Sequence, residues 1–471
     1  MNRALFLAAA LSVAAACRLA AQEPPAPAPR DTTRADSVRV DSLAADSLPA
    51  DSLAAPDTTG IGQDTTPAPL PPRRGVQPAY RRSPHLGLDP FRYVLVPHWG
   101  LVFSAGATAD NNAVNASDIG ALILLNREDS LSAETAIDAL GLVPQGKGLL
   151  GFAQGGGTVH LGGPFGRRFG LGFSVQGHAY GSLRLDENAV ALLRDGNASR
   201  QDFSLGQSGG AALATAEGGV HAVLRFGATG DEPGLRVIVG LGARYLKPLA
   251  YARGGSAIAN GGTLRLTGDS IAAHVQAETQ FTYQSNDNPL DVKGSGLASD
   301  FMLRFEWPRP GLAFEATLAN VGTVKIQGVE RRLATFNVAT TDYRVVKDSL
   351  DAVEFRVQDT SEVTVTLPRV LRLAASAWVL PMLQLDAAFT TSVTGDFAAP
   401  QILEAGATLR LIRQVPLRVG WISAGDYGSG LTGGIGIESR VLYVEFSGAS
   451  LGGSFKTARG AGGRVEFGFF F

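Results

Sequence analysis

The sequence predicts an all-β protein: a transmembrane antiparallel β-barrel of about 14–16 strands, with short helices in extracellular loops and a disordered N-terminal tether. Three observations support this prediction. Segments of alternating apolar and polar residues follow one another over residues 90–471 without a helical layer between them. The last segment ends on an aromatic residue, and the chain begins with an apolar run typical of exported proteins.

The chain begins with a predicted export signal. A short positive region precedes an apolar run at residues 4–16, which is too short to span a bilayer and fits the core of a signal peptide. We expect residues 1–21 to be removed by cleavage before Gln22. An alternative is that Cys17, the only cysteine, becomes the acylated first residue of a lipoprotein. In either case the exported chain forms no internal disulfide.

Residues 22–89 have a different composition. Pro, Ser, Thr and Asp dominate, and an Asp-Ser-(Val/Leu) unit recurs at Asp36, Asp41, Asp46 and Asp51. This spacing matches the period of neither a helix nor a strand. The segment also has too little apolar surface to offset the entropy lost on ordering. We therefore predict a disordered periplasmic tether, and the repeat is a possible binding site for a periplasmic partner.

The strand segments have one apolar and one polar face. In residues 271–284, Ile271 and Val275 share a face, while His274 and Glu278 lie on the other. A soluble β-sandwich shows the same alternation. Here, however, the polar faces carry charges of both signs as well as glycine, which is 58 of 471 residues. Because only a closed sheet leaves no unpaired edge in hydrocarbon, we favour a barrel whose apolar face meets lipid.

The terminal segment supports the same prediction. Val465, Phe467, Phe469 and Phe471 alternate with polar residues and glycine up to the last position. This pattern resembles the C-terminal signal by which assembly machinery recognises bacterial outer-membrane barrels. The expected location is therefore the bacterial outer membrane, and the expected partners are outer-membrane lipid and the barrel assembly machinery.

The number of strands is left open between 14 and 16. About 15 segments are clear, and a bacterial single-chain barrel needs an even number. One further strand at 263–266 gives 16, and losing one segment to a loop gives 14. Short connections, expected on the periplasmic side, lie at 307–311, 380–382, 413–416 and 438–440. Longer ones, expected to be extracellular, lie at 107–148, 180–210, 322–366 and 450–461.

Two of the long connections contain amphipathic helical patterns, at residues 130–142 and 186–196, and Asp186 is the expected N-cap of the second. Their apolar faces either pack on each other over the barrel mouth or receive a hydrophobic ligand.

The polar faces supply the candidate lumen residues. Buried charges require partners, so mixed signs favour a narrow, occupied interior over an open pore. The candidates are Arg236, Arg244, His274, Glu278, Arg304, Glu306, Glu315, Arg372, Asp386, Glu404, Arg410 and Arg418.

Other kinds of site have little support. A net charge of −2 without a basic stripe argues against nucleic acid. Ser174 and His178 lie four apart on a predicted strand, about 13 Å, too far for a catalytic dyad without a residue from another strand. The oxygen-rich residues 285–291 could hold calcium, but they are also ordinary turn formers. We expect no catalytic residue, no metal and no cofactor.

Two stretches carry a family resemblance: "VLVPHWGLVFSAGATADNNAVNASD" at 94–118 and "LAFEATLANVGTVKIQG" at 312–328. They resemble an uncharacterised family of outer-membrane barrels related to long-chain fatty acid transporter (FadL-type) and PorV-type barrels. The resemblance spans residues 90–471 and implies their barrel fold. Asn112-Ala113-Val114 stands where fatty acid transporters have Asn-Pro-Ala, so no binding residue is carried over.

Together these observations predict a non-enzymatic barrel for passive uptake of small hydrophobic molecules. The alternative is a structural or assembly barrel that anchors a periplasmic or secreted partner without transport. A hydrolase within the barrel would require a Ser–His pair within hydrogen-bonding reach.

Overall fold

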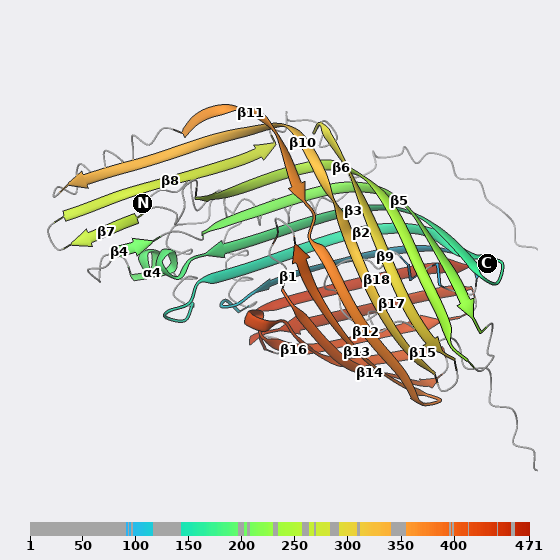
Figure 1. The fold of residues 1–471 in the computed structure, drawn as a ribbon. Helices are drawn as coiled ribbons and strands as arrows, with labels where there is room; N and C mark the ends of the chain where they lie inside the picture. Colours follow the sequence, from blue (N-terminus) through green and yellow to red (C-terminus); the bar gives the residue numbers. More distant parts are fainter. Residues whose placement is uncertain are drawn as a thin grey trace, which may run out of the picture. The chain divides into compact units, whose positions relative to one another are not determined.

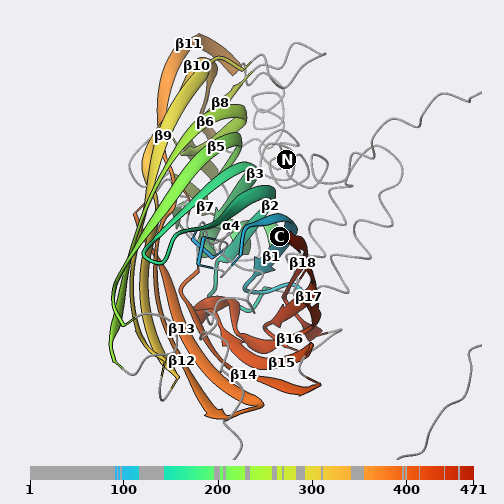
Figure 2. The same cartoon turned by 90° about the vertical axis from the view of Figure 1, so that its right-hand side faces the viewer.

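The computed structural model shows a closed antiparallel β-barrel of 14 strands (Figures 1 and 2). The structure describes residues 91–471 except 93, 96–97, 116–142, 196–201, 205–207, 229–233, 257–262, 268–269, 283–291, 309–310, 341–354, 395–396, 398–399, 413, 440 and 454–456. The predicted signal peptide with Cys17, the whole tether, the helix at 130–142 and the calcium candidate at 285–291 lie outside the described residues.

The first and last strands close the barrel. β1 (Gly100–Asn111) pairs with β18 (Gly460–Phe470) on one side and with β2 (Leu149–Phe165) on the other. The ring continues through β3 (Phe169–Leu185), β5 (Gly209–Gly227), β6 (Arg236–Ser256), β9 (Gly294–Trp307), β10 (Leu312–Thr340), β12 (Arg369–Leu380), β13 (Leu383–Thr394), β14 (Ile402–Ile412), β15 (Val415–Ser423), β16 (Ser429–Glu438) and β17 (Leu442–Leu451). Each strand pairs antiparallel with the next, so no edge remains in the wall.

Four further strands extend the sheet beyond one end of the barrel: β4 (Asp202–Ser204), β7 (Thr263–Thr267), β8 (Ser270–Thr282) and β11 (Phe355–Thr366). β8 lies between the C-terminal parts of β6 and β10, and β11 pairs with β10. Figure 2 shows β10 and β11 rising beyond the strands of the wall.

This extension corrects two predictions. The strand expected at 263–266 exists, but it pairs with β8 and β4 rather than completing a ring of 16. The connection expected at 322–366 is mostly strand, because β10 runs to Thr340 and β11 begins at Phe355. The strongest alternation, at 271–284, belongs to the extension instead of the wall.

A β-bulge marks the point where β10 passes from the wall into the extension. The register between β9 and β10 shifts between Leu318 and Val321, and Asn320 has a φ of 61°. Asparagine tolerates this left-handed conformation better than most residues. Its backbone N–H donates to Asp300 Oδ1 at 3.0 Å, and its Nδ2 donates to the carbonyl of Pro368 at 3.2 Å. The Asn320-Val321-Gly322 segment, within the stretch at 312–328 that carries the family resemblance, therefore lies at this bulge.

The helix predicted at 186–196 is confirmed as α4 (Glu187–Asp195). Asp186 caps it, because Asp186 Oδ1 accepts a hydrogen bond from the backbone N–H of Asn188 at 3.0 Å. Among the described residues, no helix is long and apolar enough to cross a membrane.

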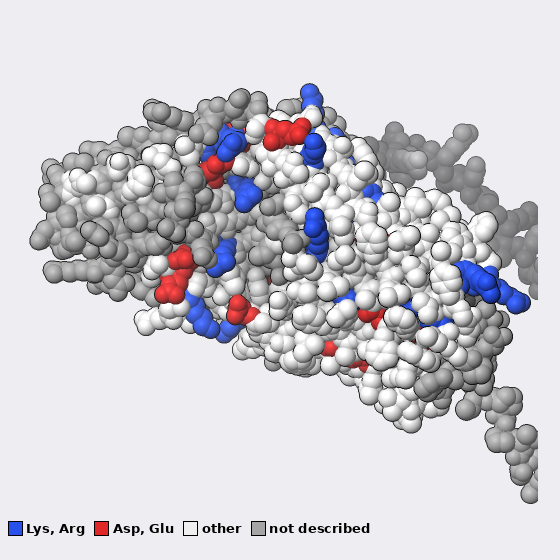
Figure 3. Space-filling model, viewed as in Figure 1, with Lys and Arg blue, Asp and Glu red and all other residues white. Residues whose placement is uncertain are grey.

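The wall has its apolar side outward. Phe389 and Phe467 are each 37% exposed, whereas Arg304 on the inner side is 1% exposed. The barrel wall in Figure 3 is mostly free of charged residues. The arrangement is the inverse of a soluble β-sandwich, as the mixed charges of the polar faces predict.

The outward apolar side leads to a direct prediction. Leu303 is 40% exposed on the outer side of β9, and Val441 is 64% exposed at the end of the wall, just before β17. We expect Leu303→Arg to lower the free energy of unfolding by about 2–4 kcal/mol and Val441→Arg by about 0–1 kcal/mol, because lipid penalises a charge most far from the interface. Urea unfolding in lipid vesicles measures both, and equal small losses would contradict a lipid-facing wall.

Candidate functional site

A turn that precedes β1 crosses the interior at one end of the barrel, the end where β1 begins and β18 ends. We call residues 91–95 the N-terminal turn; the backbone N–H groups of Val94 and Leu95 donate to the carbonyl of Phe91. Phe91 and Val94 are fully buried against a cluster with Val223, Ile238 and Met302, on β5, β6 and β9.

On the other side of the ring, Arg92 fixes the same turn. Its guanidinium donates to Glu466 on β18 at 2.7 Å and to the hydroxyl of Tyr443 on β17 at 2.6 Å. Since Phe91 contacts β5, β6 and β9 while Arg92 contacts β17 and β18, the turn bridges separated parts of the wall. The interior is therefore occupied at this end.

Paired charges line the interior next to Arg92. Arg410 donates to Glu438 at 2.7 Å, and Arg418 lies 2.9 Å from Glu445 and 3.3 Å from Glu438. Arg464 pairs with Glu466 on its own strand. All six side chains are at most 10% exposed, so each charge depends on its partners rather than on bulk water.

A second group of charges lies on β6, β9 and β10. Arg304 is 1% exposed and donates to Glu306 at 2.7 Å and to Glu315 at 2.8 Å. Arg236 adds a contact to Glu306 at 3.2 Å. Glu315 and Arg304 face each other across the β9–β10 pair, so antiparallel register creates this ion pair.

The central network surrounds Arg244. This guanidinium donates two hydrogen bonds to Asp300, at 2.8 and 2.9 Å, and also pairs with Glu217. Gln176 donates to Glu217 at 2.7 Å, and His178 Nδ1 lies 3.2 Å from the same carboxylate. Arg244 is thereby neutralised from two strands, and a connected polar network lines the inner side of β3, β5, β6 and β9 at this level.

Glycines make room for the interior histidines. A Cβ added at Gly242 would lie 2.4 Å from His221 Cδ2, and one at Gly156 would lie 2.5 Å from His178 Cδ2. The imidazole rings therefore lie against bare backbone. This explains part of the high glycine content, since a larger residue would push the rings into the polar network.

Among the described residues, the Ser174–His178 pair does not form, because Ser174 Oγ is buried and has no hydrogen-bond partner. His221 Nε2 lies 3.4 Å from Asp300 Oδ2. The described residues also contain no group of three or more His, Cys, Asp or Glu side chains that could hold a metal.

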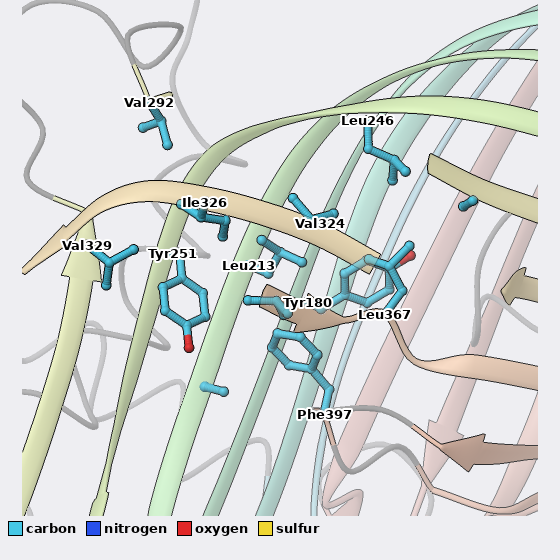
Figure 4. Close-up of a cluster of buried hydrophobic side chains, with 13 residues drawn as sticks. Tyr180, Leu213, Leu246, Tyr251, Val292, Val324, Ile326, Val329, Leu367 and Phe397 are labelled. Carbon is cyan, nitrogen blue, oxygen red and sulfur yellow. The ribbon is translucent and has the colours of Figure 1, made fainter. Parts of the chain in front are cut away.

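An apolar cluster lies inside the part of the barrel next to the extension (Figure 4). We call it the upper apolar cluster. Its buried members are Tyr180, Ala211, Leu213, Leu246, Tyr251, Val292, Ala298, Val324, Ile326, Val329, Val365, Leu367 and Phe397. Most belong to the arc of strands from β3 to β11, and Phe397 comes from the connection between β13 and β14.

A cavity of about 890 Å³ opens above this cluster; we call it the vestibule. Its charged lining residues are Arg184, Arg253, Glu278, Arg331 and Asp426. Burial would raise the pKa of Glu278, but hydrogen bonds from Gln280 and Arg331 outweigh it, so the pKa lies below its ordinary value. Arg331 lies 2.7 Å from Glu278. At neutral pH the vestibule therefore presents a polar, ion-paired rim.

The predicted candidates fall into three groups. Arg244, Arg304, Glu306, Glu315, Glu404 and Arg418 are buried inside the barrel. Arg236, Arg372 and Arg410 are partly buried and paired, and Asp386 is half-buried. His274 and Glu278 lie on the extension, where His274 is exposed and Glu278 lines the vestibule. The last two are corrections, because strand alternation alone cannot separate wall from extension.

Several contributors were missed. Asp300 lies on β9 with the predicted Arg304 and Glu306, whereas Glu217 lies on β5, which holds no predicted candidate. Both have the inward parity of their strands, so alternation could have found them. Arg92 belongs to no strand, and Phe397 belongs to a connection, so no period marks either one.

No protein-family model and no curated protein matches the chain. Solved structures similar to it include the Ralstonia pickettii toluene transporter TbuX (11% identity, TM-score 0.41, 80% of this chain and 89% of that one). Two others are the P. putida toluene transporter TodX (8%, 0.44, 81% and 92%) and a Pseudomonas aeruginosa FadL homologue (11%, 0.41, 81% and 92%). The structural neighbours thus include FadL-type proteins, as the sequence resemblance predicts. At TM-scores below 0.5, the function has to be argued from this chain's own geometry.

The interior ion pairs predict a large difference between two substitutions. Arg304→Met leaves Glu315 without its buried cation and Glu306 with Arg236 alone, and we expect a loss of about 3–5 kcal/mol in the free energy of unfolding. Lys325→Met removes an exposed pair, Lys325–Glu362 at 3.6 Å, and should cost about 0–1 kcal/mol. Urea titration of both variants in vesicles tests this; similar losses would show that the interior charges are well hydrated.

Proposed function

We propose that the protein is a bacterial outer-membrane barrel for passive uptake of small hydrophobic molecules, without enzymatic activity. The observation that carries the proposal is an apolar cluster inside the barrel, next to a vestibule that opens to solvent. Ala211 belongs to both, so the two spaces adjoin. An apolar molecule entering the vestibule meets buried apolar surface there and gains about 25 cal/mol for each Å² removed from water.

The charged levels argue against a water-filled pore. Beyond the upper apolar cluster, the network around Arg244 and the ion pairs of Arg304 and Arg418 occupy the interior, and the N-terminal turn crosses its end. A hydrophilic solute would have to separate buried ion pairs, which is costly. An apolar molecule gains nothing by entering these levels, so its route must leave the cluster through the wall.

Next to the upper apolar cluster, the wall strand β6 changes its pairing partner. β6 pairs with β9 up to Leu246 and with β8 only from Ala252 onward. Between these two sets of pairings, Lys247 Nζ donates to the carbonyl of Val292 at 2.6 Å. Leu246 and Val292 are themselves members of the upper apolar cluster. This change of partners beside the cluster supports a sideways route from the cluster into the bilayer.

The terminal residues support recognition by the assembly machinery as a further part of the proposal. Val465, Phe467, Phe469 and Phe471 are 37–75% exposed, so their apolar side chains are available on the outer side of β18. The anchoring alternative depends on the tether, and no contact among the described residues favours it.

Uptake of radiolabelled benzene by cells that express the protein tests the proposal. We expect uptake above that of vector-only cells. Leu213→Asp puts a charge in the upper apolar cluster and should reduce uptake at least ~10-fold. An unpaired carboxylate is costly to bury, and water that hydrates it would occupy the space of an apolar ligand. Leu213→Met conserves volume and should have little effect.

A second measurement separates this function from that of a general porin. Liposomes carrying the protein should swell in arabinose no faster than protein-free liposomes, since the paired charges close the interior to hydrated sugars. Rapid swelling together with unchanged benzene uptake in Leu213→Asp would overturn the proposal.

A further inference from the structure

The upper apolar cluster is completed by one side chain from the far side of the barrel. Phe397 is 2% exposed and lies three residues beyond β13, yet its ring centroid is 6.1 Å from that of Tyr180 on β3. Around the ring, β3 and β13 are separated by six pairings through β5, β6, β9, β10 and β12. The maximum in a ring of 14 strands is seven. The Phe397–Tyr180 contact therefore crosses the interior.

The other members of the cluster do not cross it. They come from β3, β5, β6, β9, β10, β11 and the residues next to them, which form one continuous arc of wall. Without Phe397, this arc would be a concave apolar surface facing the interior (Figure 4). The phenyl ring of Phe397 therefore occupies a site whose other surfaces are formed by the strands of this arc.

The same connection also borders the vestibule. Pro400 and Gln401 line the vestibule, while Phe397 lies in the cluster. Ala211 lies in both from the β5 side. Phe397 is thus located where a molecule passing from the vestibule to the wall arc would have to enter.

We propose that the wall arc facing Phe397 is a binding site for an apolar molecule of about phenyl size, and that the Phe397 ring occupies this site in the absence of ligand. The proposal rests on the proposed function and gives its substrate a defined location. A ligand must displace the ring to bind. Its apparent affinity therefore equals the affinity for the open site multiplied by the fraction of molecules in which the ring has already left the site.

Phe397→Ala removes the competing ring and leaves an apolar cavity of a kind that remains dry and binds benzene in other proteins. We expect this variant to unfold at a lower temperature than the unchanged protein. We also expect benzene to raise its unfolding temperature, with an apparent affinity at least ~10-fold higher than in the unchanged protein.

Phe389→Ala is the matched control, because Phe389 lies on β13 and is exposed on the outer side of the wall. This substitution also removes a phenyl ring, but from the outer side of β13, so it leaves the interior unchanged. Benzene affinity should therefore not change. Phe397→Leu provides a second variant if the alanine variant fails to fold. It retains much of the apolar volume but loses the ring, and it should show a smaller increase in the same direction.

The outcomes are distinguishable. Tighter benzene binding in Phe397→Ala than in both the unchanged protein and Phe389→Ala supports the site. Equal binding in all three overturns it, even if cells still take up benzene, and in that case the proposed function stands alone. If Phe397→Ala binds benzene tightly but neither it nor the unchanged protein raises cellular uptake above that of vector-only cells, the site stands and the uptake function fails.

Discussion

The structure depends on one constraint: a closed sheet with an apolar outer side has to place its charges inside, where each needs a partner. Arg304 lies between Glu306 on its own strand and Glu315 on the neighbouring strand, and Arg244 lies between Asp300 and Glu217. The Arg304–Glu315 pair and both pairs of Arg244 span adjacent strands, so they form only when the register is correct. The electrostatics and the strand pairing thus favour the same arrangement.

The same constraint determines which molecules the interior accommodates. Charged side chains that pair with one another need few water molecules to hydrate them. At one end of the barrel, Phe91 and Arg92 of the N-terminal turn also occupy the interior. Apolar surface is found instead at the level next to the vestibule. The interior is therefore ordered along its length, from a polar rim to an apolar cluster and then to paired charges, and only apolar molecules find favourable contacts at the middle level.

The sequence was sufficient for the architecture of the wall but not for its two ends. Period-two alternation and the terminal aromatic residues predict an outward apolar side, and this depends only on local pattern. The same pattern occurs in β8, which extends beyond the barrel, so His274 and Glu278 were assigned to the lumen. Arg92 and Phe397 act through contacts with strands far away in the sequence, on segments with no period, and only the folded chain brings these contacts together.

The bulge at Asn320 shows how the wall and the cluster are connected. Asp300 accepts two hydrogen bonds from Arg244 and one from the backbone of Asn320, so one carboxylate joins the central charged network to the bend in β10. Immediately beyond the bend, Val324 and Ile326 enter the upper apolar cluster. The bend turns these residues inward at the height where β6 exchanges β9 for β8. The apolar cluster and the change of partner of β6 therefore both lie just beyond the bulge, on the side of it away from the charged network.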